Sequence, residues 1–131
     1  MTRREAREIA FALLFENTFS EKGIEAVIED AKEAETLAPN DFSVSLAMGT
    51  VERIEEIDQK IEEASHKWST GRMSRVSLSV IRLAVYEMIF EDATPVSVSI
   101  NEAVELAKKY GGEEEAAFVN GVLGGIAKVS A

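Results

Sequence analysis

The sequence predicts an all-α fold, a compact bundle of six or seven helices. Apolar residues recur at helical spacing along most of the 131 residues, whereas strand-like alternation is confined to Val96, Val98 and Ile100, which continue into a helical pattern. The chain has no internal repeat and no low-complexity segment. Its length and its 46% hydrophobic content suit a single domain, residues 1–131, with a buried core.

The first helix is predicted at the amino terminus, where Thr2 and Glu5 have the spacing of a capping box. Apolar residues then form one stripe along this helix: Ala6, Ile9, Ala10, Leu13 and Leu14. Several charged residues lie off the stripe, so we expect them on the solvated face: Arg3, Arg4, Arg7 and Glu8.

Two further helices are predicted between the first helix and residue 67. The second begins near Ile24, buries one apolar side and ends before Pro39. Asn40 or Asp41 caps the third. The apolar residues of this third helix recur at spacings near 3.5, so it runs to about Lys67 as one long rod or as two joined pieces: Val44, Ala47, Met48, Val51, Ile54, Ile61, Ala64 and Trp68.

The fourth and fifth helices lie either side of residues 92–95. Ser74 can cap the fourth, which is apolar almost all round and is therefore predicted to be the central buried helix. Asp92 to Pro95 ends it. Ser97 or Ser99 opens the fifth helix, and Gly111 stands where a helix commonly stops in a left-handed turn.

The last helix begins near Glu114 and contains three glycines within five residues. Each glycine inside a helix costs about 1 kcal/mol relative to alanine, so another element must approach closely to offset that loss. Gly121 and Gly125 lie four positions apart on one face. The pattern favours intimate packing against a neighbouring helix over direct contact with a ligand.

The composition limits the classes of function. With 24 acidic and 14 basic residues the formal net charge is −10, so any binding to a polyphosphate requires a local basic patch. Basic residues do cluster, in three groups: Arg3, Arg4 and Arg7; Arg72, Arg75 and Arg82; and Lys108 and Lys109 beside Tyr110. The chain has no cysteine, no long apolar run and no signal-peptide pattern, which together indicate a cytoplasmic protein without membrane attachment.

No constellation of residues predicts catalysis, a cofactor or a metal site. His66 is the single histidine, and its place at the polar end of a helix is typical of a surface residue rather than a general base or a ligand. The carboxylates neither converge with a histidine nor follow the spacing of a calcium loop. The glycines do not form the phosphate loop GxxxxGK[ST]. We therefore expect a protein that is not an enzyme.

Four blocks of sequence, taken in order, carry a resemblance to a known family: AREIAFALLFE at 6–16, RLAVYEM at 82–88, SINEAVELAKKYGG at 99–112 and FVNGVLGGIAK at 118–128. Their order and spacing resemble the NusB family of transcription antitermination factors. The resemblance implies a small, helical, non-catalytic protein that binds the boxA element of nascent ribosomal RNA together with the ribosomal protein NusE. In that role it prevents premature termination by RNA polymerase.

The resemblance also implies candidate site residues. The family's RNA surface corresponds here to Arg3, Arg4, Arg7, Lys108, Lys109, Tyr110, Phe118 and Asn120. Tyr110 and Phe118 would stack on bases of single-stranded RNA, and Asn120 would read a base edge. Core packing for Phe118 and a capping or structural amide for Asn120 remain alternatives. The family's partner contacts come from the central helices, which suggests exposed residues around Ser77, Glu87 and Glu102.

Two departures from the family pattern affect the expected function. Glu5 interrupts an arginine run, and Gly124 stands where an aspartate is common, so we expect low RNA affinity without the partner. The main alternative is a protein-only helical adaptor or homodimer that does not bind RNA. Another is an accessory domain of an RNA methyltransferase, which the lack of an attached cofactor-binding domain disfavours.

Overall fold

The computed structural model describes residues 1–35, 37–65, 69–91 and 93–130, and its regular structure within these ranges is entirely helical. There are seven α-helices and one short 3-10 turn in this part of the chain, which confirms the predicted all-α class. In order they are α1 (Arg3–Asn17), α2 (Ile24–Ala34), α3 (Asp41–Glu52), α4 (Ile54–Ser65), η1 (Thr70–Arg72), α5 (Arg75–Phe90), α6 (Val96–Gly111) and α7 (Glu113–Ser130).

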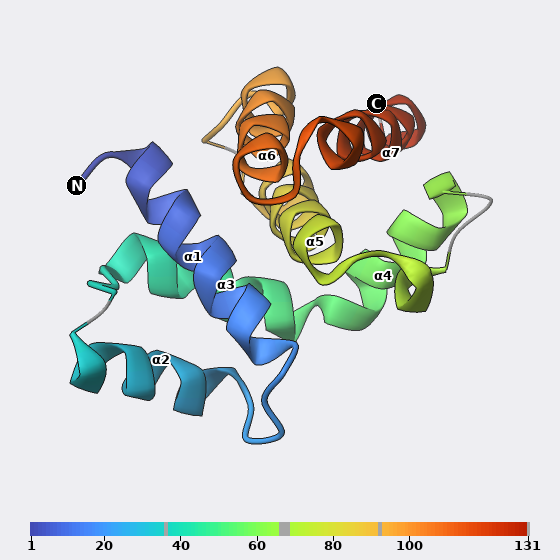
Figure 1. Ribbon diagram of the computed structural model, residues 1–131. Helices are drawn as coiled ribbons and strands as arrows, with labels where there is room; N and C mark the ends of the chain where they lie inside the picture. Colours follow the sequence, from blue (N-terminus) through green and yellow to red (C-terminus); the bar gives the residue numbers. More distant parts are fainter. Residues whose placement is uncertain (36, 66–68, 92, 131) are drawn as a thin grey trace.

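Helix α5 lies at the centre of the bundle (Figure 1) and packs against α1, α3, α4, α6 and α7. On one side α1 contacts α2 and α3, and on the other α6 pairs with α7, while α4 bridges α5 and α7. The side chains of Val80, Ile81 and Val85 are at most 1% exposed. The prediction that this helix is the central buried one is confirmed. Asp92, at its expected end, lies outside the described residues.

Three predicted helix starts are confirmed by their caps. Thr2 Oγ1 accepts a hydrogen bond from the Glu5 main-chain N–H at 3.1 Å. The Asn40 side chain and Ser43 form a reciprocal capping box at the start of α3. Ser74 caps α5. Because each cap satisfies main-chain donors that a helix start leaves unpaired, these local sequence signals position the amino-terminal ends of α1, α3 and α5.

Of the two alternatives for the segment after Asn40, one long rod or two joined pieces, the structure shows the second. Arg53, with φ −106° and ψ 17°, separates α3 from α4 and turns the chain so that α4 reaches α5 and α7. Further on, the left-handed turn falls on Gly112, with φ 99°, and not on Gly111, which is the last residue of α6. The shift by one residue lets α6 and α7 follow each other almost without a loop.

The expectation that Ser97 or Ser99 opens the fifth helix is wrong. Helix α6 begins at Val96, and Pro95 occupies the capping position without a side-chain bond. The Pro95 carbonyl already accepts hydrogen bonds from the main-chain N–H groups of Val98 and Ser99, at 3.0 and 3.2 Å. Ser97 therefore lies inside the first turn, where its side chain has no capping role.

The expected close approach at the glycines of the last helix is wrong for Gly121. A Cβ atom there would meet no described atom within 4 Å, whereas a Cβ on Gly125 would make an ordinary contact with Ala64 at 3.6 Å. The close approach occurs instead at Gly49 of α3, where a Cβ would collide with the Tyr86 ring of α5. Among the described residues, no helix combines the length and apolar character needed to cross a membrane.

Candidate nucleic-acid interface

The carboxyl-terminal end of α6 lies beside α1, and one carboxylate joins the two helices. Lys109 Nζ donates to both oxygens of Glu8, at 2.7 and 3.1 Å, although the two residues are 101 positions apart. Tyr110 Oη donates to Oε1 of the same carboxylate at 2.5 Å. The Tyr110 ring packs against Phe11 with the ring centroids 5.0 Å apart. The fold therefore brings Lys109 and Tyr110, two of the three predicted RNA-binding residues of α6, onto the surface of α1.

A second ion pair links the same two helices nearer the start of α1. The Arg4 guanidinium binds Glu102 in bidentate fashion, with Nε 3.0 Å and Nη2 3.1 Å from the carboxylate oxygens. The Arg3 guanidinium carbon stands 4.4 Å above the centre of the Phe42 ring. Lys108 Nζ forms an ion pair with Glu113 Oε1 at 3.9 Å, and its side chain is 56% exposed. Of the four exposed cations predicted to bind RNA, Arg4 and Lys109 are hydrogen-bonded to acids across the α1–α6 contact, and Lys108 is in a longer ion pair with Glu113.

The electrostatics of the cluster follow from these contacts. Hydrogen bonds from Lys109 and then Tyr110 hold the pKa of the Glu8 carboxyl below its usual value. The hydrogen bond to Glu8 raises the pKa of Tyr110, and burial raises it further. Contact with Glu8 likewise raises the pKa of Lys109. At neutral pH the Lys109 ammonium is therefore charged, and the Tyr110 phenol is protonated and 45% exposed.

Arg7 is not on the solvated face, and that expectation is wrong. Its side chain is 6% exposed and donates from Nε to both oxygens of Glu87 in α5, at 2.8 and 3.0 Å. A terminal nitrogen of Arg7 also reaches Thr94 Oγ1 at 3.4 Å. Burial raises the pKa of Glu87, and the hydrogen bond from Arg7 opposes that rise. Arg7 is thus committed to fixing α1 on α5 and has no exposed group to offer a phosphate.

Phe118 and Asn120 lie on α7, beyond the turn at Gly112. Phe118 is half-buried and lines a shallow cavity of about 370 Å³ between α7 and the start of α5, together with Arg72, Met73, Ser74, Ser77, Glu114 and Glu115. Asn120 is exposed, so it is not a buried structural amide. In the described structure no ring contact joins Phe118 to the α1–α6 cluster and no side-chain hydrogen bond joins Asn120 to it, so their role in RNA contact stays a prediction.

Two of the three predicted partner residues are buried, so the expectation that they are exposed is wrong. Ser77 and Glu87 are each 2% exposed. The Ser77 hydroxyl donates to Glu115 of α7 at 2.8 Å, and Glu87 is paired with Arg7. Both therefore stabilise helix packing because their polar groups are used inside the bundle. Glu102 retains partial exposure, but its carboxylate holds Arg4.

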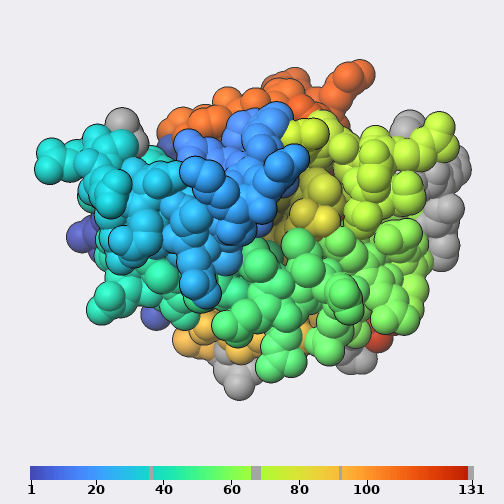
Figure 2. Space-filling model, turned by 90° about the horizontal axis from the view of Figure 1, so that it is seen from below, coloured from blue at the N-terminus to red at the C-terminus, as the bar shows by residue number. Residues whose placement is uncertain are grey.

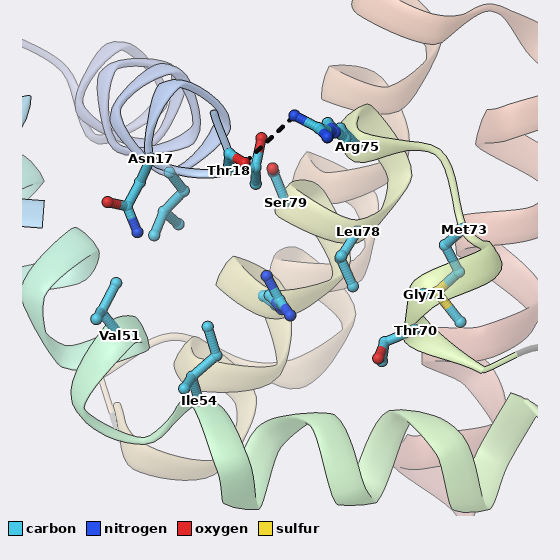
Figure 3. A pocket seen from close by; sticks show the side chains of 12 residues that line it. Asn17, Thr18, Val51, Ile54, Thr70, Gly71, Met73, Arg75, Leu78 and Ser79 are labelled. Carbon is cyan, nitrogen blue, oxygen red and sulfur yellow. Dashed lines mark hydrogen bonds between the residues drawn. The ribbon is translucent and has the colours of Figure 1, made fainter. Parts of the chain in front are cut away.

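A cavity of about 350 Å³ opens between the end of α1, the α3–α4 junction and the start of α5 (Figure 3). In the space-filling view α5 is visible at the floor of a hollow between α1 and α4 (Figure 2). Asn17 Oδ1 and Ser79 Oγ lie buried there without a partner among the described residues. Arg75 Nη1 donates a hydrogen bond of 3.2 Å to the main-chain carbonyl of Thr18, the residue that follows α1. Arg82 binds both carboxylate oxygens of Asp58. Such a polar, open cavity has room for water to hydrate both atoms.

Among the described residues, no group of three or more histidine, cysteine or acidic side chains is arranged to hold a metal ion. His66, the only histidine, lies outside the described residues. Sequence reasoning missed Glu8 as a member of the α1–α6 cluster, because its partners are 101 and 102 positions away and no local pattern connects them.

Comparisons with known proteins match both the sequence and the fold of this chain to one family. The model of the NusB family matches residues 4–128. Transcription antitermination protein NusB of Clostridium acetobutylicum is 43% identical over 128 residues, which cover 96% of this chain and 95% of that protein. The protein of the same name from Agathobacter rectalis is 46% identical over 127 residues, covering 94% and 97%.

Solved structures give the same result. T. maritima NusB is 35% identical to this chain, with a TM-score of 0.86, and the match covers 98% of this chain and 92% of that one. A chain in the crystal structure of the antitermination factors NusB and NusE in complex with dsRNA is 31% identical, with a TM-score of 0.86 and coverage of 97% and 96%. NusB from Aquifex aeolicus, solved in solution, is 32% identical with a TM-score of 0.83.

Proposed function

We propose, from the premise that this chain belongs to the NusB family, that it binds the boxA element of nascent ribosomal RNA together with a NusE-type ribosomal protein. The chain is a non-catalytic transcription antitermination factor, and residues 1–131 act as one RNA- and protein-binding domain in the cytoplasm. The observation that carries the RNA proposal is the convergence of exposed cations from α1 and α6 on one surface of a chain whose net charge is −10.

The chemistry of this surface suits single-stranded RNA. Arg3, Arg4, Lys108 and Lys109 supply exposed guanidinium and ammonium groups for phosphates. Tyr110 offers a ring held against α1 on which a base can stack. On α7, Phe118 and Asn120 would add a second ring and an exposed amide as separate RNA contacts. Arg7 acts indirectly, because its buried pair with Glu87 anchors the helix that carries the other arginines.

The acidic remainder of the molecule suits a basic ribosomal partner. Charge complementarity accelerates association and disfavours wrong partners, so a chain with 24 acidic and 14 basic residues fits a NusE-type protein. The burial of Ser77 and Glu87 removes them from direct contact with that partner. With both partners bound, the assembly would join the antitermination complex on RNA polymerase. A helical adaptor or homodimer without RNA binding is the competing outcome.

Fluorescence anisotropy of labelled boxA RNA, with and without NusE, tests the RNA proposal. We expect binding in the presence of NusE and a log affinity that falls by about 0.7 per phosphate contact for each unit of log salt. The double variant Arg3→Gln/Lys108→Gln should bind more weakly and flatten the slope by roughly 1.4. Lys32→Gln, an exposed lysine on α2, is the matched control and should behave as the parent.

The result that rejects the RNA proposal is a folded parent that fails to bind boxA RNA at micromolar concentration with NusE present. Gel filtration of the same samples then distinguishes a NusE complex from a homodimer. Phe118→Ala separates stacking from charge. If a base stacks on this ring, RNA binding weakens by about 1 to 3 kcal/mol while the salt slope stays nearly unchanged.

A further inference from the structure

We infer that Glu8 and Glu102 are specificity-determining residues of the RNA surface. Each carboxylate is bound to a cation that would otherwise be available to an RNA phosphate. The inference rests on the function proposed above and adds to it the residues that weaken the binding of nonspecific RNA. Its basis is the geometry of two ion pairs that bridge α1 and α6, Arg4 with Glu102 and Lys109 with Glu8.

Both pairs have the form that these cations adopt with phosphate. Two nitrogens of Arg4 approach the Glu102 carboxylate at 3.0 and 3.1 Å, the fork arrangement by which a guanidinium also grips two phosphate oxygens. Lys109 Nζ lies 2.7 Å from Glu8, so its ammonium is likewise occupied. A phosphate that arrives at either cation must displace a carboxylate rather than water.

Glu8 controls the candidate stacking ring as well as a cation. It accepts the Tyr110 hydroxyl at 2.5 Å, while the ring itself packs on Phe11 at 5.0 Å between centroids. Displacing Glu8 therefore releases Lys109 and the Tyr110 hydroxyl in one event, and the packing on Phe11 keeps the ring in place. A phosphate and a base that arrive together gain more from this event than a phosphate alone.

As a consequence, RNA that contacts the protein only through its sugar-phosphate backbone binds with lower affinity. Unspecific RNA offers the surface mainly phosphates, and at Arg4 and Lys109 each phosphate exchanges one anion for another. RNA that also places bases on the rings and on Asn120 keeps those gains in full. Glu8 and Glu102 thus widen the ratio between specific and unspecific binding, at the expense of absolute affinity.

The test compares Glu8→Gln and Glu102→Gln with Glu105→Gln, each in complex with NusE. Glu105 is exposed on α6 and close enough to influence Arg4, but within the described structure it forms no hydrogen bond or ion pair, so it controls for the loss of one negative charge. The probes are boxA RNA and poly(U) of the same length. We expect the first two variants to bind poly(U) roughly two- to fivefold more tightly than Glu105→Gln does.

The same two variants should show a steeper salt slope and a smaller ratio of boxA to poly(U) affinity. Equal gains in all three variants would overturn the inference, because the effect would then come from net charge alone. That failure is distinct from failure of the proposed function, which shows as a parent that binds no boxA RNA at all.

A measurement without RNA checks that the Glu8 contact exists in solution. In a Tyr86→Phe background, absorbance titration follows Tyr110 alone, the second of the two tyrosines. The hydrogen bond to Glu8 raises the pKa of Tyr110, so Glu8→Gln should lower that pKa toward its ordinary value while Glu105→Gln leaves it unchanged. A Tyr110 pKa that Glu8→Gln does not move would overturn the inference, since the carboxylate would then not be bound to the α6 cluster.

Discussion

Arg7→Met should destabilise the protein strongly, because it removes one partner of a buried ion pair. The Arg7 and Glu87 side chains are 6% and 3% exposed, and Nε lies 2.8 and 3.0 Å from the two carboxylate oxygens. Removing one member of such a pair typically costs about 3 to 5 kcal/mol of unfolding free energy, since the other charge stays buried without compensation. This loss is a large fraction of the total stability of an ordinary domain.

Urea denaturation followed by far-UV circular dichroism measures the effect. With a denaturant slope of about 1 to 3 kcal/mol per molar urea, the midpoint should fall by roughly 1 to 5 M. Arg4→Met is the matched control, because it removes an arginine of the same helix whose side chain is 70% exposed, and it should shift the midpoint far less. Equal midpoints for the two variants would refute our account of the buried pair.

Two further variants keep the test decisive if Arg7→Met fails to fold. Arg7→Met/Glu87→Leu removes both buried charges and should recover most of the lost stability. In Arg7→Met alone, the pKa of Glu87, already raised by burial, rises further. Its contribution to stability is then greatest below its unfolded pKa and is lost as pH rises through the folded value, so this variant should be more stable at mildly acidic than at alkaline pH.

The remaining predictions concern packing, helix propensity and acid stability. Gly49→Ala should cost about 1 to 3 kcal/mol in urea melts, because the added methyl collides with Tyr86. Gly121→Ala should stabilise by up to about 1 kcal/mol in the same assay, since its Cβ enters open space within a helix. Leu83→Ala, in the buried α5, should cost about 2 to 5 kcal/mol of unfolding free energy. Glu8 has a lowered pKa, so its stabilising contribution is lost as pH falls through that value, and Glu8→Gln should lose less stability than the parent in acid melts.

The fold could be predicted from the sequence because its signals are local. Apolar residues all round α5 place it at the centre, and the caps at Thr2, Asn40 and Ser74 locate three helix starts. The errors arise where two local signals compete. Ser97 and Ser99 are good capping residues, but the preceding Pro95 fixes the start of α6 earlier.

The position of Arg7 was harder to predict, although part of the signal is in the sequence. Phe11 and Leu14 lie four and seven positions after Arg7 on the same face of α1, and they are 3% and 5% exposed. The buried side of α1 is thus wider than the stripe of Ala6, Ala10 and Leu13 suggests, and Arg7 lies within it. What the sequence could not supply is the compensating charge, since Glu87 is 80 positions away on another helix.

The same limit explains why composition alone describes the RNA surface poorly. A net charge of −10 predicts repulsion of RNA, and clustered arginines predict attraction, but neither statement says which cations are available. The fold decides this through contacts 98 to 102 positions apart, which bind Arg4 and Lys109 to carboxylates. Within the described structure, Arg3 and Lys108 make no hydrogen bond to an acid. The attraction that displaces no hydrogen-bonded carboxylate therefore comes mainly from these two residues. For this reason we expect tight RNA binding only when a partner contributes further contacts.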